Sequence, residues 1–163
     1  MKTVAMVDLD GVLADSGWRA HLARIDHLLN PELEVEQRFH EYHKHCYWDC
    51  LLSNTVRFVR RRVKNGFGSC YITTARPESV RNSTEMWLDL YNLRPLAVLM
   101  RAPGDLSSSP ELKVKMLRAI ESTGAKVEWA FDDRLDILAA LRDSGVPRLY
   151  CVDHEGTIYE PFN

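Results

Sequence analysis

The chain has 163 residues, of which 45% are hydrophobic and 27% are charged, and its formal net charge is −2. This length and composition are typical of one soluble globular domain with a substantial core, and we expect a single domain over residues 1–163. A charge so near zero excludes a general attraction to nucleic acid or to anionic lipid, so any polyanion binding would need a local patch. No stretch approaches the roughly 18 apolar residues that span a membrane.

The cysteines and the N-terminal residues bear on where the protein works. The four cysteines are Cys46, Cys50, Cys70 and Cys151. They are scattered through a chain without a signal peptide at its start, so we expect reduced thiols and a cytoplasmic location. Cys46 and Cys50 lie near His40, His43 and His45, which leaves a zinc site as an alternative, although this spacing matches no common zinc template.

The first predicted element is a strand of four consecutive apolar residues, Val4 to Val7, which is typical of a strand buried on both faces. It leads into two acidic residues, Asp8 and Asp10, and Gly11 then lets the chain turn away sharply. Two carboxylates buried together are costly unless a cation or a proton compensates them, which indicates a metal or proton-transfer site. The alternative is a strand end whose acids only cap the next segment.

The remaining elements alternate in type along the chain. We expect helices at about 16–29, 32–49, 55–64, 77–91, 111–122 and 134–143, and strands at about 69–73, 96–100, 127–131 and 148–152. This order predicts an α/β fold with an open parallel sheet flanked by helices on both faces. In such sheets, ligands bind at the carboxyl ends of the strands. That edge collects the following side chains: Asp8, Asp10, Thr74, Arg76, Asp132 and Asp133.

The stretch from Asp8 to Asp15, Asp-Leu-Asp-Gly-Val-Leu-Ala-Asp, resembles the first motif of the haloacid dehalogenase (HAD) phosphatase superfamily. The resemblance implies that Asp8 is a nucleophile that forms an aspartyl-phosphate and that Asp10 is the general acid/base. Asp10 would then need a pKa raised toward neutrality, which burial and a neighbouring carboxylate can supply. The resemblance also implies Mg²⁺, held by Asp8, by the backbone carbonyl of Asp10 and by Asp132.

The second HAD motif is a Ser or Thr at a strand end, and the stretch from Ile72 to Glu78, Ile-Thr-Thr-Ala-Arg-Pro-Glu, resembles it. The resemblance implies that Thr74 hydrogen-bonds the phosphoryl oxygens and that Arg76 makes a forked contact with phosphate. Thr73 fits less well, because in the family the hydroxyl-bearing residue stands two residues before the Arg, as Thr74 does relative to Arg76. The alternative is that Thr74 only caps the following helix.

The third and fourth motifs are a Lys that offsets negative charge around the nucleophile and an acidic pair after a strand. Lys113 and Lys115 are the two candidates for this motif lysine, and the spacing from an upstream Gly-Asp pair in related sequences favours Lys113. The stretch Phe-Asp-Asp-Arg resembles the acidic motif, which implies that Asp132 holds the metal directly and that Asp133 orients Lys113 or a metal-bound water. Asp136 offers an alternative Asp-x-x-x-Asp spacing.

A more specific resemblance covers the first motif and roughly residues 69–152. Thr-Ala-Arg-Pro-Glu, then Leu-Met-Arg, then Lys113 and the acidic pair look like the 3′-phosphatase domain of phage-type polynucleotide kinase/phosphatase. This resemblance implies removal of a 3′-phosphate from DNA, RNA or nucleoside monophosphates. The sequence contains no Gly-x-x-x-x-Gly-Lys-Ser/Thr loop, so it lacks the kinase half of such enzymes.

Residues 16–53 match no motif and are expected to form a small helical cap, inserted into a core of about 1–15 and 54–163; such inserts choose the substrate. The opening motif also resembles 5′(3′)-deoxyribonucleotidases, so a free nucleotide is the alternative substrate. A non-catalytic binding module is the alternative from a different class, and a homo-oligomer is left open.

Further arginines are candidates for binding the substrate. We expect Arg19 and Arg101 to help bind its phosphate. A basic cluster on one predicted helix consists of Arg57, Arg60, Arg61, Arg62 and Lys64. With the aromatic residues upstream, this cluster is suited to follow a nucleic-acid backbone, and the alternative is that it forms only a solvated helix face.

Overall fold

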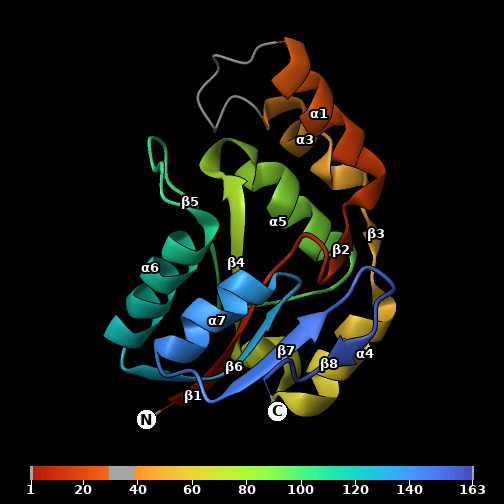
Figure 1. The fold of residues 1–163 in the computed structure, drawn as a ribbon. Helices are drawn as coiled ribbons and strands as arrows, with labels where there is room; N and C mark the ends of the chain where they lie inside the picture. The colour runs from red at the N-terminus through yellow and green to blue at the C-terminus, as the bar shows by residue number, and fades with distance from the viewer. Residues whose placement is uncertain (1, 30–38, 163) are drawn as a thin grey trace.

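A computed structural model describes residues 2–29 and 39–162 of the chain. Within them, a six-stranded sheet has the order β5-β4-β1-β6-β7-β8 (Figure 1). The strands are β1 (Lys2–Val7), β4 (Cys70–Pro77), β5 (Ala97–Arg101), β6 (Ala125–Asp132), β7 (Arg148–Val152) and β8 (Ile158–Tyr159). The strands from β5 to β7 are all parallel, and β8 is antiparallel to β7. The predicted open parallel α/β sheet is therefore confirmed, with a short antiparallel strand added at one edge.

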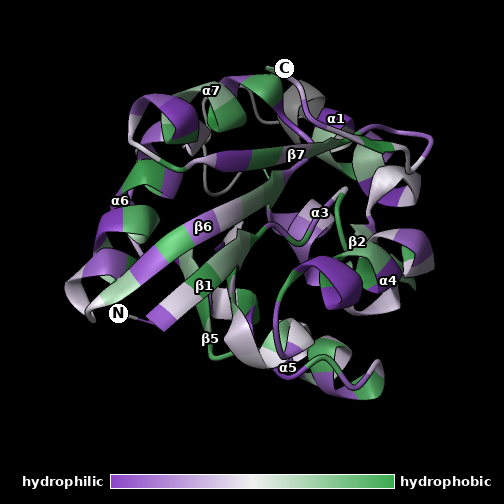
Figure 2. Cartoon of the chain, turned by 90° about the horizontal axis from the view of Figure 1, so that it is seen from below, coloured by the Kyte–Doolittle hydropathy of each residue, from purple (hydrophilic) through white to green (hydrophobic). Residues whose placement is uncertain are grey.

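Strand β1 lies at the centre of the sheet because both of its faces are apolar. Ala5 and Val7 pack with α4 (Ser53–Arg62) and α5 (Arg81–Leu90) on one face, whereas Val4 and Met6 pack with α6 (Ser109–Ser122) and α7 (Leu135–Asp143) on the other. This alternation follows from the two-residue period of a strand. Figure 2 shows the two helix pairs on opposite sides of β1 and β6.

The segment between β1 and α4 forms an insert outside the main sheet, and its two ends lie side by side. It contains β2 (Ala14–Asp15), a 3₁₀ turn, α1 (Ala20–Leu29), α3 (His40–Lys44), a second 3₁₀ turn (Cys46–Trp48) and β3 (Cys50–Leu51). Strands β2 and β3 pair antiparallel and close the base of this insert. The division into core and cap stays a prediction. Residues 32–38 of the predicted 32–49 helix lie outside the described residues, and the rest of it contains the short helix α3 and a 3₁₀ turn.

Two local expectations differ from the structure. Strand β4 continues through Pro77, so Thr74 and Arg76 belong to the strand, at an irregularity in its pairing with β5 between Thr73 and Pro77. The helix predicted from residue 77 begins as a 3₁₀ turn, and α5 then buries Trp87 and leaves Leu90 60% exposed. No helix in the described part of the chain is both long and apolar enough to cross a bilayer.

Candidate active site

An acidic cluster lies where β1 and β6 end side by side. The parallel pairing of Val7 with Phe131 brings the next residues of both strands together, and the amide of Asp8 donates to the carbonyl of Phe131 at 2.9 Å. As a result, one carboxylate oxygen from each of Asp8, Asp132 and Asp133 lies within 4.8 Å of the other two. Two acidic segments more than a hundred residues apart in sequence thus form one site, as the sequence predicts.

Gly11 makes room for this cluster. Its φ is +80°, a left-handed backbone conformation that glycine adopts without strain. A Cβ at this position would collide with the Asp133 carboxylate. The glycine is therefore needed both for the turn after Asp10 and for the close approach of Asp133 to this loop.

Lys113, in α6, contacts two of the acidic groups. Its Nζ lies 2.6 Å from Oδ1 of Asp8 and 3.0 Å from Oδ2 of Asp132, and it donates to the carbonyl of Thr73 at 2.6 Å. The other candidate, Lys115, is 62% exposed on the same helix. Of the two lysines, Lys113 is therefore the one that meets the predicted nucleophile.

The cluster carries more negative than positive charge. Burial raises the pKa of Asp8 well above its ordinary value; Lys113 opposes this, and Asp132 and Asp133 add to it. Withdrawal from water and the neighbouring Asp132 raise the pKa of Asp133 to about 6. Three carboxylates beside one ammonium group leave an excess of negative charge that a divalent cation would compensate. Their oxygens are also the hard donors that Mg²⁺ prefers. The residues present therefore fit Mg²⁺.

Asp10 lies in a different charge environment. Its Oδ1 accepts from Arg19 at 2.5 Å and from Arg76 at 2.7 Å, and its Oδ2 accepts from Nε of Arg76 at 3.0 Å. Burial alone would raise the pKa of Asp10, but Arg76 and then Arg19 outweigh it and hold that pKa far below its usual range. The expected pKa near neutrality is therefore wrong for this structure, because two guanidinium groups stabilise the carboxylate.

The Asp10 side chain also stands apart from the acidic cluster. The described cluster with metal-ligand spacing is formed by Asp8, Asp132 and Asp133 and does not include the Asp10 carboxylate. The carboxylate of Asp10 instead accepts hydrogen bonds from Arg19 and Arg76. The expected contribution of its backbone carbonyl to metal binding stays a prediction.

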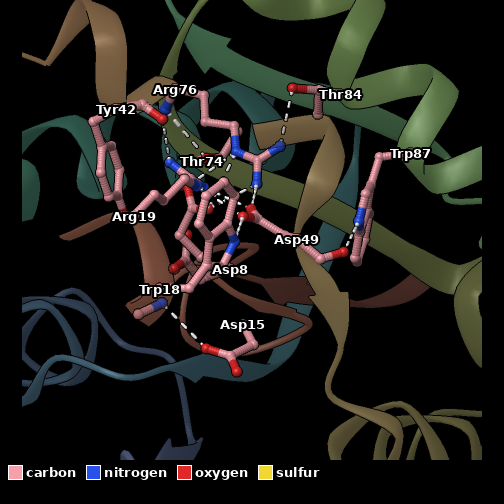
Figure 3. A network of polar contacts seen from close by, with 12 residues as sticks. Asp8, Asp15, Trp18, Arg19, Tyr42, Asp49, Thr74, Arg76, Thr84 and Trp87 are labelled. Atoms are coloured by element: carbon pink, nitrogen blue, oxygen red, sulfur yellow. Dashed lines mark hydrogen bonds and ion pairs between the residues drawn. The ribbon is translucent and has the colours of Figure 1, made fainter. Parts of the chain in front are cut away.

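Asp49 completes this network and was not predicted from the sequence. It comes from the insert, is 2% exposed, and accepts from Arg19 at 2.7 and 2.6 Å and from Arg76 at 2.9 Å. The indole of Trp18 donates to its carboxylate at 3.0 Å, and the indole of Trp87 in α5 donates to its backbone carbonyl at 2.8 Å (Figure 3). Asp49 therefore joins the insert to the core by ionic and neutral hydrogen bonds.

The predicted phosphate-binding residues have different positions. Arg19 and Arg76 are fully buried in the network with Asp10 and Asp49 and do not border the cavity at this edge, so their direct contact with a phosphate stays a prediction. Arg101 does border the cavity, and its guanidinium donates to the carbonyls of Asp105 and Ser107 at 2.8 Å each. Thr74 borders it too, and its Oγ1 accepts from the amide of Arg76 at 3.2 Å.

The cavity has a volume of about 290 Å³ and extends from the acidic cluster to the insert. On the sheet side it is bordered by Asp8, Asp10, Thr74, Lys113 and Asp133, on the insert side by Ser16, Phe39, Tyr42 and His43, and elsewhere by Arg101, Asp105, Ser109 and Arg134 among others. The basic cluster of α4 does not border it. In the described ranges, the cysteines and histidines of the insert do not form a group with metal-ligand spacing.

The fold can be compared with solved structures. A chain of the Pnkp1/Rnl/Hen1 RNA repair complex matches 99% of this chain with a TM-score of 0.72 at 18% identity. A haloacid dehalogenase-like hydrolase from Streptococcus pneumoniae matches 91% of it with a TM-score of 0.60 at 13% identity, over 83% of that hydrolase. The chain has the HAD fold.

The HAD fold is also seen in a HAD-superfamily hydrolase from Geobacter sulfurreducens, which matches 91% of this chain and 85% of its own length, with a TM-score of 0.52 at 17% identity. In the RNA repair complex the match covers 44% of the other chain, so this chain spans less than half of that protein. No protein-family model and no curated protein matches the sequence. The similarity therefore establishes the architecture, and the chemistry depends on the residues of the site.

Proposed function

We propose that this protein is a Mg²⁺-dependent phosphomonoesterase that acts through an aspartyl-phosphate on Asp8. The observation that carries the proposal is the meeting of Asp8 with Lys113, Asp132 and Asp133 at the carboxyl end of the sheet of a HAD fold. A nucleophilic carboxylate must approach a phosphate that is itself anionic, so positive charge has to surround both. Lys113 is placed to supply part of it.

The side chains divide the reaction between them. Asp8 attacks phosphorus, the ester oxygen leaves as an alcohol, and water then hydrolyses the acyl phosphate, so one hard displacement becomes two easier ones. Thr74, which borders the cavity, would hydrogen-bond a phosphoryl oxygen. Mg²⁺, held by Asp8, Asp132 and Asp133, would neutralise charge on the phosphoryl group and the attacking carboxylate.

Asp10 serves the proton transfers. The two arginines keep it ionised, which is the form that takes a proton from the attacking water in the second step. In the first step it must give a proton to the leaving oxygen, so it has to take up a proton from solvent as the substrate binds. We therefore expect the contact of one guanidinium with Asp10 to loosen when the phosphoryl group of the substrate arrives, which raises the pKa of Asp10 and allows this uptake.

The substrate class we propose is a nucleic-acid 3′ end or a nucleotide carrying a 3′-phosphate. Two findings support it: the motif order resembles that of polynucleotide 3′-phosphatases, and the fold is similar to a chain of an RNA repair complex. A free nucleotide, processed as by a 5′(3′)-deoxyribonucleotidase, is the second candidate, because the opening motif resembles those enzymes as well.

A panel of phosphate esters in Mg²⁺ tests the proposal. It compares 3′-phosphorylated and 5′-phosphorylated oligonucleotides with 3′-nucleoside and 5′-deoxynucleoside monophosphates, and it measures released phosphate. We expect hydrolysis of the 3′-phosphates and none by Asp8→Asn, whose folding is checked by circular dichroism. Preference for 5′-deoxynucleotides would overturn the substrate class, and no release from any ester would overturn the enzyme function.

A further inference from the structure

The insert side of the cavity is a wall of aromatic rings. Phe39, Tyr42 and His43 all border the cavity, and their ring centroids lie 5.1 to 6.1 Å apart. The guanidinium of Arg19 covers the ring of Tyr42 at 4.0 Å, so one face of that ring is already occupied. Phe39, in contrast, is 39% exposed. Of the three rings, that of Phe39 is therefore the most open to a ligand, and His43 borders the same cavity.

His43 has an unsatisfied polar atom in this wall. Its Nδ1 is buried and has no hydrogen-bond partner among the described residues. An unpaired buried nitrogen is costly, so each one calls for a partner such as a ligand. Burial and the nearby Arg19, Arg76 and Arg101 lower the pKa of His43 to about 4, against the opposing effect of Asp10. A neutral imidazole offers one donor and one acceptor, which suits the polar edge of a heterocycle.

The position of the wall defines which part of a substrate would meet it. The phosphoryl group belongs beside Asp8 and Lys113, and Thr74 borders the same end of the cavity. The leaving group of the ester then extends toward α3, which Figure 1 shows above the tip of β4. A volume of about 290 Å³ is near the lower limit of small-molecule sites, about 300 Å³, and suits one small ring system rather than a large one.

We propose that Phe39 and His43 form a subsite for a nucleobase of the leaving group, with the ring of Phe39 stacking on the base and the imidazole of His43 turning to present its unpaired Nδ1 to the edge of the base. The inference rests on the phosphatase function proposed above and adds which part of the substrate the insert recognises. Stacking on an aromatic side chain tolerates different bases, because every base has an aromatic face. His43 then adds a preference for bases with a polar group in reach.

Two esters that differ in the base test the subsite. Thymidine 3′-monophosphate and glycerol 2-phosphate are both phosphate esters of secondary alcohols, but only the first carries a base. We expect Phe39→Leu to raise KM for thymidine 3′-monophosphate about tenfold, the loss of one stacking contact, and to leave kcat and the kinetics of glycerol 2-phosphate unchanged. His43→Leu should act in the same direction, and His43→Gln should restore part of the loss. His40→Ala, on the same helix and 69% exposed, is the matched control.

Calorimetry provides a readout that does not depend on turnover. Titration of Asp8→Asn with thymidine 3′-monophosphate should show binding that is weakened about tenfold when Phe39→Leu is added. Equal effects of Phe39→Leu on both esters, or no effect on either, would overturn the subsite and leave the phosphatase function standing. If the wild-type protein hydrolyses neither these two esters nor the oligonucleotides and nucleotides of the panel, the proposed function fails, and calorimetry of the two esters then decides the subsite by itself.

Discussion

Removal of the Asp49 carboxylate should weaken the contact between the insert and the core. Its carboxylate and that of Asp10 balance the charges of Arg19 and Arg76, so Asp49→Asn leaves one buried positive charge without compensation. Removing one partner of a buried ion pair costs about 3–5 kcal/mol. Both arginines keep their contacts with Asp10, and Arg19 also keeps the carbonyl of Tyr42, so we expect the lower end of that range.

The expected loss of unfolding free energy is therefore about 3 kcal/mol, which lowers Tm by roughly 6–12 °C in a domain of this size. Urea denaturation followed by tryptophan fluorescence measures it. Asp136→Asn is the matched control, because Asp136 pairs with Arg134 at 2.6 Å while its side chain is 55% exposed, and it should cost less than about 1 kcal/mol. If Asp49→Asn unfolds within about 0.5 kcal/mol of the wild type, the network does not hold the insert as described.

Three further outcomes follow from the site. Gly11→Ala should weaken Mg²⁺-dependent activity by displacing Asp133, whereas Gly104→Ala, with a φ of +75° but open space around it, should show only backbone strain; equal Mg²⁺ titrations would contradict this. Because the pKa of His43 is about 4 when folded and about 6.5 when unfolded, stability contributed by neutral His43 is lost as the pH falls from 6.5 toward 4. His43→Gln should therefore reduce the stability lost between pH 7 and 5 by about 2 kcal/mol in urea denaturation, and an unchanged loss would refute this. A chelator should abolish phosphate release and Mg²⁺ should restore it; full activity in the chelator would exclude the metal site.

The sheet and its acidic edge were predictable because they depend on local patterns. Four apolar residues before Asp8 indicate a buried central strand, and the alternation of elements fixes which strand ends share an edge. Lys113 was identified from its spacing, and burial separates it from Lys115 in the structure. The sheet and its edge need only the period and the order of the elements along the chain, whereas the choice of Lys113 depends on the resemblance to the HAD motifs.

The network around Asp10 was not predictable in the same way. Arg19 and Asp49 meet 30 residues apart through the geometry of an insert whose sequence matches no motif, and no periodicity indicates which of its acids is buried. The direct contacts of Asp10 with Arg76 and Arg19 reversed the expected direction of its pKa shift.

The nucleophilic role of Asp8 is the central claim, and trapping the covalent intermediate tests it most directly. The protein is mixed with a substrate whose 3′-phosphate is radiolabelled, quenched in acid within one turnover, digested and mapped by mass spectrometry. We predict label on the peptide that contains Asp8, removed by hydroxylamine and absent from Asp8→Asn. Rapid phosphate release without any labelled protein, or label on a different side chain, would contradict the mechanism.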